Sequence, residues 1–276
     1  MPRGRDPARY TAGRAPRPSL PRLGSVIVLL PPSETKHEPS RGRALDLQTL
    51  SFPALGPTRA AVLADLARAS ARPDALHVLG VSAGLADQVA RNIGLLAAPT
   101  APAGRIYTGV LYDALDLAGL DAAAHRRAGR RLIVVSALFG ALRIGDRIPA
   151  YRLSMGVSLP GLGRLTSVWR EPLEDVLPAA VSRGLVIDCR SAAYAAAWTP
   201  RSDLADRWVH VRVPGVSHLA KHTRGLVARA LCQSPADPRH PADLAGLLSA
   251  AGFDVALNSP ARRGPPWALD VTPPTP

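Results

Sequence analysis

The chain has 276 residues, of which 47% are hydrophobic and 4% aromatic, so it is long enough to bury a substantial core. No window approaches the about 18 apolar residues of a membrane helix, and Cys189 and Cys232 are too few for a disulfide framework or a four-thiolate metal site. The net charge of +13 favours anionic partners, and we expect a soluble, cytoplasmic protein without membrane contact.

The first half of the chain alternates apolar runs with helical patterns. Residues 1–24 are rich in arginine and proline and predict a disordered extension in front of a single domain over residues 25–260. A continuous apolar run over residues 25–30 stops at Pro31, which is typical of a strand buried on both faces of a parallel sheet. Helical spacing then predicts helices from Pro57 and over residues 85–93, 111–117 and 121–129.

The second half of the chain begins with its strongest strand pattern. Residues 131–136 are apolar and β-branched, and they lead into a segment over 137–147 that we interpret as loop-rich. Further strands are expected over residues 184–188, 208–213 and 253–257, and further helices over residues 166–182, 217–231 and 241–250. From Pro260 the proline-rich end, residues 261–276, is expected to fray.

Strands that alternate with helices predict an α/β fold with a mixed or mainly parallel sheet covered by helices. In such sheets, ligands bind beyond the carboxyl ends of the strands. We therefore expect Lys36, residues 136–147 and residues 188–194 to converge at one edge of the sheet.

Three residues are candidates for catalytic chemistry. Lys36 and Lys221 are the only lysines in a chain whose other basic residues are arginines. An amine can lose its proton and act as a base or nucleophile, whereas a guanidinium cannot, although ordinary surface placement would also explain both lysines. Asp188 ends an apolar strand, where burial would raise its pKa toward that of a general base; capping of the next helix is the alternative.

Arginines and tyrosines recur close together along the chain. Such sets suit a planar anionic ligand, because arginine forks match phosphate oxygens and a tyrosine face can stack on a base. The residues that we expect to stack are Tyr107, Tyr151 and Tyr194, and those that we expect to bind an anion include Arg143, Arg152, Arg190 and Ser191. Alternatively, the tyrosines are packing residues and the arginines pair with Asp146 or Asp188.

The predicted helix over residues 217–231 carries His218 and His222 four residues apart, a spacing that can bind a metal. There is no glutamate beside His218 and no obvious third ligand, so we expect no metal site and no cofactor. The favoured interpretation is a basic helix face made of His218, Lys221 and Arg224 that binds an anion.

Several segments together resemble one known family. They are Leu30-Pro-Pro-Ser-Glu-Thr-Lys36, Ile106-Tyr-Thr-Gly109, Val135-Ser-Ala-Leu-Phe-Gly-Ala-Leu-Arg143, Pro149-Ala-Tyr-Arg-Leu-Ser-Met-Gly156, Trp169, Val186-Ile-Asp-Cys-Arg-Ser-Ala-Ala-Tyr194 and Val216-Ser-His-Leu-Ala-Lys-His-Thr-Arg-Gly225. Their order and spacing resemble those of the YaaA family of peroxide stress proteins. The resemblance implies a cytoplasmic α/β protein with a family-specific fold, a basic cleft and a helix-hairpin-helix element. Residues 79–84 are the best candidate for the hairpin.

The resemblance also implies a function: limiting free iron, and so iron-dependent damage, during peroxide stress, together with binding of duplex or distorted DNA. The predicted function is therefore a peroxide stress protein that binds DNA through the basic cleft. The alternative is an enzyme acting on a nucleotide or another phosphorylated small molecule, with Lys221 and Asp188 as reacting groups and Arg143 and Arg152 as the anion clamp.

Overall fold

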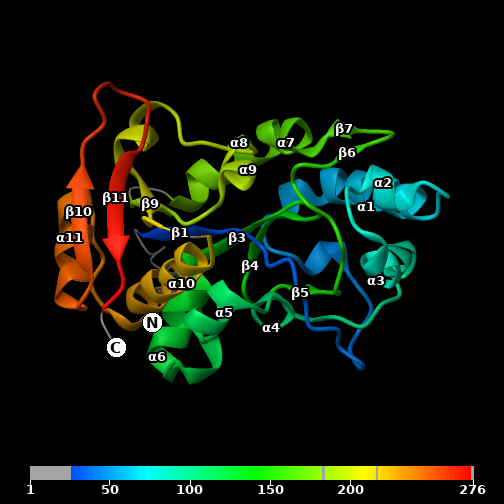
Figure 1. The fold of residues 1–276 in the computed structure, drawn as a ribbon, viewed down its shortest axis with the longest axis horizontal. Helices are drawn as coiled ribbons and strands as arrows, with labels where there is room; N and C mark the ends of the chain where they lie inside the picture. The colour runs from blue at the N-terminus through cyan, green and yellow to red at the C-terminus, as the bar shows by residue number, and fades with distance from the viewer. Residues whose placement is uncertain (1–25, 182–183, 216, 275–276) are drawn as a thin grey trace, which may run out of the picture.

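The computed structural model describes residues 26–181, 184–215 and 217–274, so the predicted extension over residues 1–24 lies outside the described residues. Seven strands form the main sheet, in the order β10-β11-β9-β8-β1-β3-β4 (Figure 1). Their bounds are β1 (Ile27–Leu30), β3 (Leu132–Ser136), β4 (Gly140–Arg143), β8 (Val186–Asp188), β9 (Trp208–Arg212), β10 (Asp254–Asn258) and β11 (Trp267–Thr272). Two short ribbons pair β2 (Ala101–Pro102) with β5 (Arg147–Ile148) and β6 (Ser158–Leu159) with β7 (Gly163–Arg164).

The centre of the sheet is parallel, as predicted. β1 pairs in parallel with β3 and β8, β8 with β9, and β9 with β11. Every residue of β1 and β3 is buried, which is why both strands have continuous apolar sequences rather than alternating ones. In the main sheet, among the residues that the structure describes, the antiparallel pairs are the two outermost ones, β3 with β4 and β10 with β11. The predicted α/β fold with a mixed, mainly parallel sheet is confirmed.

Helices cover both faces of this sheet. The α-helices are α1 (Gly56–Ser70), α2 (Ala75–Val78), α3 (Ala86–Arg91), α4 (Ala103–Ile106), α5 (Val110–Leu115), α6 (Ala122–Arg131), α7 (Leu165–Val168), α8 (Arg170–Val181), α9 (Ala192–Ala195), α10 (Ser217–Gln233) and α11 (Pro241–Ala250). Short 3-10 helices are η1 (Leu47–Thr49), η2 (Pro53–Leu55), η3 (Ala83–Leu85), η4 (Asn92–Gly94), η5 (Leu117–Gly119) and η6 (Ser202–Arg207).

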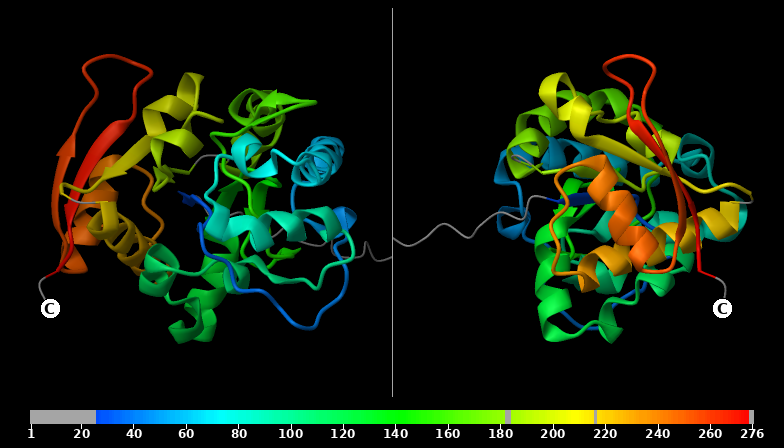
Figure 2. Two further views of the ribbon diagram at one scale, coloured as in Figure 1. Left: turned by 45° about the vertical axis from the view of Figure 1, so that its right-hand side comes forward. Right: turned by 90° about the vertical axis from the view of Figure 1, so that its left-hand side faces the viewer.

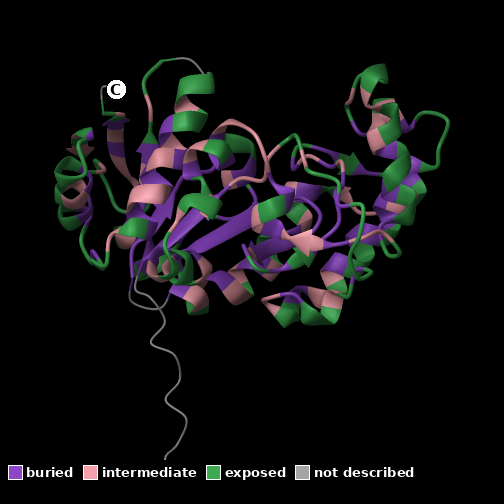
Figure 3. Ribbon diagram, turned by 90° about the horizontal axis from the view of Figure 1, so that it is seen from below, coloured by how far each residue is buried: buried purple, intermediate pink, exposed green. Residues whose placement is uncertain are grey.

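Helices pack on the two sides of the strands. α10 packs against α5 and α6, and α6 contacts β1; these helices lie below β1 in Figure 1, whereas α8, which contacts β4, lies above it. α11 covers β10 at the far edge of the sheet, the side that faces the viewer on the right of Figure 2. Buried residues follow the central strands and exposed ones follow the outer helices (Figure 3). No helix among the described residues is long and apolar enough to cross a membrane.

The interpretation of residues 137–147 as a loop-rich segment is wrong. The chain reverses after β3 and returns as β4, with Arg143 opposite Ile133 near the start of β3. Gly140 permits this reversal because its φ is +70°, and the Trp169 ring packs so closely that a Cβ at Gly140 would lie 2.5 Å from it. The buried carbonyl of Ala137 accepts a hydrogen bond from Trp169 Nε1 (2.8 Å), which fixes the turn.

The predicted fraying from Pro260 is also wrong for the segment that forms β11. Leu269 and Val271 are fully buried, and β11 lies between β9 and β10. The alternation of apolar and polar residues in this strand is a regular strand signal. The prolines before and after it masked that signal, because they dominate the composition of the segment. The expected extent of a single domain, residues 25–260, stays a prediction.

Candidate functional site

The parallel strands bring the ends of β1, β3 and β8 to one edge of the sheet, and the loop after β1 lies there. The loop after β1 runs beside residues 106–109: Lys36 forms a β-bridge with Tyr107, and His37 N donates to the carbonyl of Ile106 (2.8 Å). Tyr112, at the start of α5, donates from its hydroxyl to the carbonyl of Pro31 (2.7 Å). These contacts hold the loop after β1 over the ends of the strands.

A pocket of about 490 Å³, here called the central pocket, opens between this loop, the start of α5, the end of β8 and α10. Four of the predicted residues line it: Ser191, Tyr194, Lys221 and Arg224. Residues that sequence reasoning did not identify also line it, among them Ser33, Glu34, Thr108 and Cys189. Burial raises the pKa of the Cys189 thiol to about 12, so this cysteine lines the pocket as a neutral thiol.

The basic residues of α10 differ in their positions. Lys221 is exposed at the pocket, and Arg224 is half-buried, with its guanidinium donating to the carbonyl of Val211 (3.2 and 3.3 Å). His218 is exposed one turn earlier and is not among the residues that line the pocket. Within the described part of the chain, no group of three or more His, Cys, Asp or Glu residues is placed to hold a metal ion.

Lys36 is half-buried next to the central pocket. Its Nζ donates to the carbonyl of Ser33 (2.8 Å) and lies 4.4 Å from the ring centroid of Tyr151 and 5.8 Å from that of Tyr107. Burial lowers the pKa of this amine to about 8; the Glu34 carboxylate opposes the shift and the Arg152 guanidinium adds to it. Lys36 is therefore an amine that loses its proton at about pH 8.

The tyrosines beneath Lys36 form a buried hydrogen-bonded chain. The Tyr151 hydroxyl lies 3.0 Å from the Tyr107 hydroxyl and 2.8 Å from Ser136 Oγ. Ser136 Oγ in turn accepts from the backbone N–H groups of Leu138 (3.2 Å) and Phe139 (3.1 Å). Burial raises the pKa of both tyrosines, so they stay neutral.

The stacking roles predicted for Tyr107 and Tyr151 do not fit this arrangement, because both rings are buried and Lys36 lies over them. The alternative, that they are packing residues, describes them better. Tyr194 lines the central pocket, and burial raises its pKa to about 12. Stacking of a ligand on Tyr194 stays a prediction.

Asp188 and Arg190 form an ion pair inside the protein, and this corrects two expectations. Their side chains are 1% and 0% exposed, and Arg190 donates to both carboxylate oxygens (2.8 and 2.7 Å). Burial alone would raise the pKa of Asp188, but the charge and hydrogen bonds of Arg190 outweigh it and the pKa falls, contrary to the expectation for a general base. Arg190 also donates to the carbonyls of Tyr194 and Trp198, so it tethers α9 rather than binding an external anion.

The expected anion clamp of Arg143 and Arg152 is not assembled. Arg143 lies at the other end of β3, where it donates to the carbonyls of Arg130 and Leu132 and its guanidinium lies 5.5 Å from the ring centroid of Phe52. Its predicted convergence with Lys36 is wrong because β4 runs back from the site. Arg152 does lie near the site and forms an ion pair with Glu34 (3.0 Å).

Arg152 and Glu34 also line a second pocket of about 260 Å³, here called the hairpin pocket, together with Leu79, Gly80 and Val81. These three residues connect α2 to η3 and α3, so the candidate hairpin over residues 79–84 is placed between two helices. Gly80 has a φ of +63°, and Val81 N donates back to the carbonyl of Leu76 (2.9 Å). Glu34 belongs to both pockets.

Sequence reasoning missed a third cluster, a shallow pocket of about 280 Å³ here called the arginine pocket. Arg41, Arg105 and Arg147 line it with His37, and all three arginines are exposed. Among the described residues that line it, none is acidic. The three arginines come from segments far apart in sequence, so only the fold brings them together.

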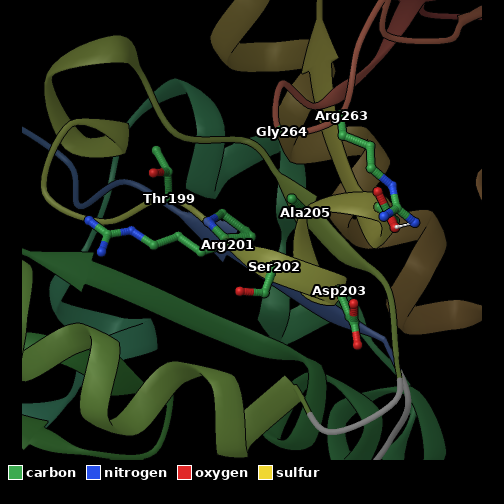
Figure 4. A pocket seen from close by; sticks show the side chains of 9 residues that line it. Thr199, Arg201, Ser202, Asp203, Ala205, Arg263 and Gly264 are labelled. Atoms are coloured by element: carbon green, nitrogen blue, oxygen red, sulfur yellow. Dashed lines mark ion pairs between the residues drawn. The ribbon is translucent and has the colours of Figure 1, made fainter.

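A fourth pocket, of about 470 Å³, lies apart from these, between η6 and the loop that precedes β11 (Figure 4). Arg263 forms an ion pair with Asp206 at its side (3.3 Å), and Arg201 extends in a different direction (Figure 4). None of the site residues predicted from the sequence lines this pocket.

Comparisons with known proteins agree on one family. The family model described as peroxide stress protein YaaA matches residues 26–258. A UPF0246 protein of Streptomyces coelicolor is 52% identical over 254 residues, covering 89% of this chain and 98% of the relative. UPF0246 proteins of Corynebacterium efficiens and Corynebacterium glutamicum are 41% and 38% identical over 241 residues, in each case covering 84% of this chain and 96% of the relative.

Proposed function

The chain belongs to the YaaA family of peroxide stress proteins, and we propose that it limits iron-dependent damage during peroxide stress by binding DNA directly, in the cytoplasm. The observation that carries the proposal is that one loop, residues 33–41, contributes to three pockets. Ser33 and Thr35 line the central pocket, Glu34 lines both the central and the hairpin pocket, and Arg41 lines the arginine pocket. Each of these three pockets, all of which have cationic side chains in their lining, therefore adjoins the same loop.

The exposed cations in the arginine pocket and the central pocket suit a phosphate backbone. Arg41, Arg105 and Arg147 are exposed guanidiniums, and Lys221 adds an exposed ammonium at the central pocket. Arginine forks bind phosphate oxygens, and each neutralised phosphate releases counterions into solution. A polyanion that follows the 33–41 loop would contact the arginine pocket at one end and the central pocket at the other.

The central pocket also favours distorted DNA over intact duplex. Its volume of about 490 Å³ lies within the usual range for small-ligand pockets, so it can take one nucleotide that has left the base stack. Tyr194 supplies an aromatic ring in this pocket for the base, while Lys221 and Arg224 supply positive charge for its phosphate. A bulged or mismatched site provides such a nucleotide at a lower unstacking cost than a regular duplex does.

The test is the salt dependence of binding to a bulged duplex. We expect the logarithm of the binding constant to fall linearly with the logarithm of the salt concentration. Replacing Arg105 by alanine should make that slope shallower by about 0.9, because one phosphate contact is lost. Arg263→Ala is the matched control, since Arg263 is exposed but lies outside the three pockets. An affinity that does not change between low and high salt would refute the proposal.

A second experiment tests whether the protein protects cells from peroxide. Cells that lack the native protein should recover peroxide survival and low chelatable iron when supplied with the wild-type chain or with Arg263→Ala. A triple variant with alanine at positions 41, 105 and 147 should restore neither. Full protection by a triple variant that no longer binds DNA would separate the stress function from DNA binding and contradict the proposal.

A further inference from the structure

We propose that Lys36 captures an abasic site in DNA by forming a covalent imine between its Nζ and the aldehyde of the ring-opened deoxyribose. This inference rests on the proposed function, because DNA binding delivers the sugar to the site. It goes beyond that function by assigning covalent chemistry, a reacting atom and a substrate class.

The position of the amine is the first argument. Lys36 Nζ donates to the carbonyl of Ser33, and Ser33 and Glu34 both line the central pocket. Glu34 also lines the hairpin pocket, where it pairs with Arg152 (3.0 Å). The charges of Glu34 and Arg152 both act on the Lys36 ammonium. The amine is therefore held against a loop whose residues line both the central pocket and the hairpin pocket.

The protonation state of the amine is the second argument. Only the neutral amine has the lone pair that attacks a carbonyl carbon. With a pKa of about 8, roughly a quarter of Lys36 is neutral at pH 7.5, compared with about one molecule in a thousand for a lysine of ordinary pKa. Burial thus produces a fraction of the reactive form without a separate base.

The bond changes are simple. The Nζ lone pair attacks the aldehyde carbon, a C–N bond forms, the C=O π bond opens onto oxygen, and one proton passes from nitrogen to that oxygen through solvent to give a carbinolamine. The hydroxyl then takes up a second proton, the C–O bond breaks and water leaves, and nitrogen releases its remaining hydrogen to solvent as the C=N bond forms. The resulting imine can bind one further proton from solvent. The face of Tyr151, 4.4 Å from Nζ, stabilises the positive charge of that protonated imine.

The surroundings point to a sugar aldehyde that carries phosphate. Lys221 and Arg224 line the central pocket and Arg152 lines the hairpin pocket, so both pockets that share Glu34 carry cationic side chains. An abasic nucleotide has a phosphate on each side of its sugar, and its missing base lowers the cost of leaving the stack. Free deoxyribose 5-phosphate has the same aldehyde with one phosphate, and the experiment distinguishes the two sources.

The experiment uses the full chain. Because the sequence has only two lysines, peptide mapping can assign an adduct to one of them without ambiguity. The protein is incubated at pH 7.5 with a duplex containing one abasic site, with the matched intact duplex, or with deoxyribose 5-phosphate. Cyanoborohydride, the reductant, converts any imine to a stable secondary amine. Intact mass and peptide mapping then locate the adduct. We expect an adduct on Lys36 with the abasic duplex and none with the intact duplex. The N-terminal amine is the internal control for non-specific capture.

Two variants complete the test. Lys36→Arg keeps a positive charge and should lose the adduct, whereas Arg263→Ala, which lies outside the three pockets, should keep it; circular dichroism confirms that each variant is folded. Mapping of the wild-type adduct decides the question even if Lys36→Arg does not fold. An adduct only on Lys221 or on the N-terminal amine would overturn the inference.

The outcomes also separate this inference from the proposed function. Tight, salt-dependent binding of the abasic duplex without any adduct would overturn the imine and leave DNA binding standing. The other outcome is a protein that does not bind DNA but forms an adduct on Lys36 with deoxyribose 5-phosphate. That outcome would refute the proposed function and DNA as the source of the aldehyde. It would leave imine formation by Lys36 standing.

Discussion

The Nζ of Lys36 lies 4.4 Å from the ring centroid of Tyr151, and burial in this position lowers the pKa of the amine to about 8. The amine therefore loses its proton at about pH 8 in the folded chain and near pH 10.5 in the unfolded chain. Between these two values, the unfolded state binds more protons, so raising the pH favours the folded state.

The first prediction follows from this difference. The free energy of unfolding of the wild type, relative to Lys36→Met, should be constant below pH 8, rise between about pH 8 and 10.5, and level off above that range. Urea denaturation of both proteins across this range measures the difference. A difference that does not change with pH would show that the folded-state pKa of Lys36 is not depressed.

The second prediction concerns the buried Asp188–Arg190 pair. Arg190→Ala leaves the Asp188 carboxylate buried without its partner, and this should lower the free energy of unfolding by about 3–5 kcal/mol. The matched control is Arg212→Ala, which breaks a bidentate pair with Asp270 whose side chains are 50% and 31% exposed. That exposed pair should be worth less than about 1 kcal/mol. Equal losses in chemical denaturation would argue against a structural role of Asp188.

The third prediction separates charge from amine chemistry at Lys221. Lys221→Arg keeps the positive charge at the central pocket and should retain binding of bulged duplex and protection from peroxide. Lys221→Ala should weaken binding uniformly across sequences and reduce the salt slope by about 1. Binding titrations at several salt concentrations measure both effects. If Lys221→Arg is folded and binds DNA but protects no better than Lys221→Ala, then Lys221 acts as an amine.

The fourth prediction tests the hairpin. Gly80 lines the hairpin pocket and has a φ of +63°, and a Cβ added there would enter open space, with no atom beyond its chain neighbours within 4 Å. Gly163 has a similar backbone, with a φ of +78° and equally open surroundings, but lies in the β6–β7 ribbon. Each alanine should cost about 1–2 kcal/mol of stability. Only Gly80→Ala should also weaken binding of bulged duplex. Equal affinities of the two variants would show that the hairpin does not contact the DNA.

The sequence predicted the strands whose apolar residues are contiguous. β1 and β3 have no polar residue before their ends, and both were placed correctly along with the helices that follow them. β4 was missed because its first residue is Gly140 and its turn depends on Trp169, which lies far along the chain. β11 was missed because the prolines around it resemble a frayed terminus. In both cases, a contact distant in sequence decides the structure.

The sequence predicted those parts of the candidate site whose residues lie within one helix or strand. The helical spacing of Lys221 and Arg224 placed them on one face of α10, and both line the central pocket. The burial of Asp188 was also foreseen, but not that Arg190, two residues later, turns back to pair with it. The arginine pocket depends on three separate segments, so no local pattern indicates it.

The place of β11 in the sheet has a consequence for how the chain is made. β10 is synthesised before β11, yet it joins the sheet only through β11, which lies between β10 and β9. During translation, β9 has an unpaired edge and β10 has no strand to pair with until residues 267–272 leave the ribosome. The parallel centre can assemble early, but this edge of the sheet closes late. A nascent chain stalled before Trp267 therefore exposes a strand edge that chaperones or other chains can bind.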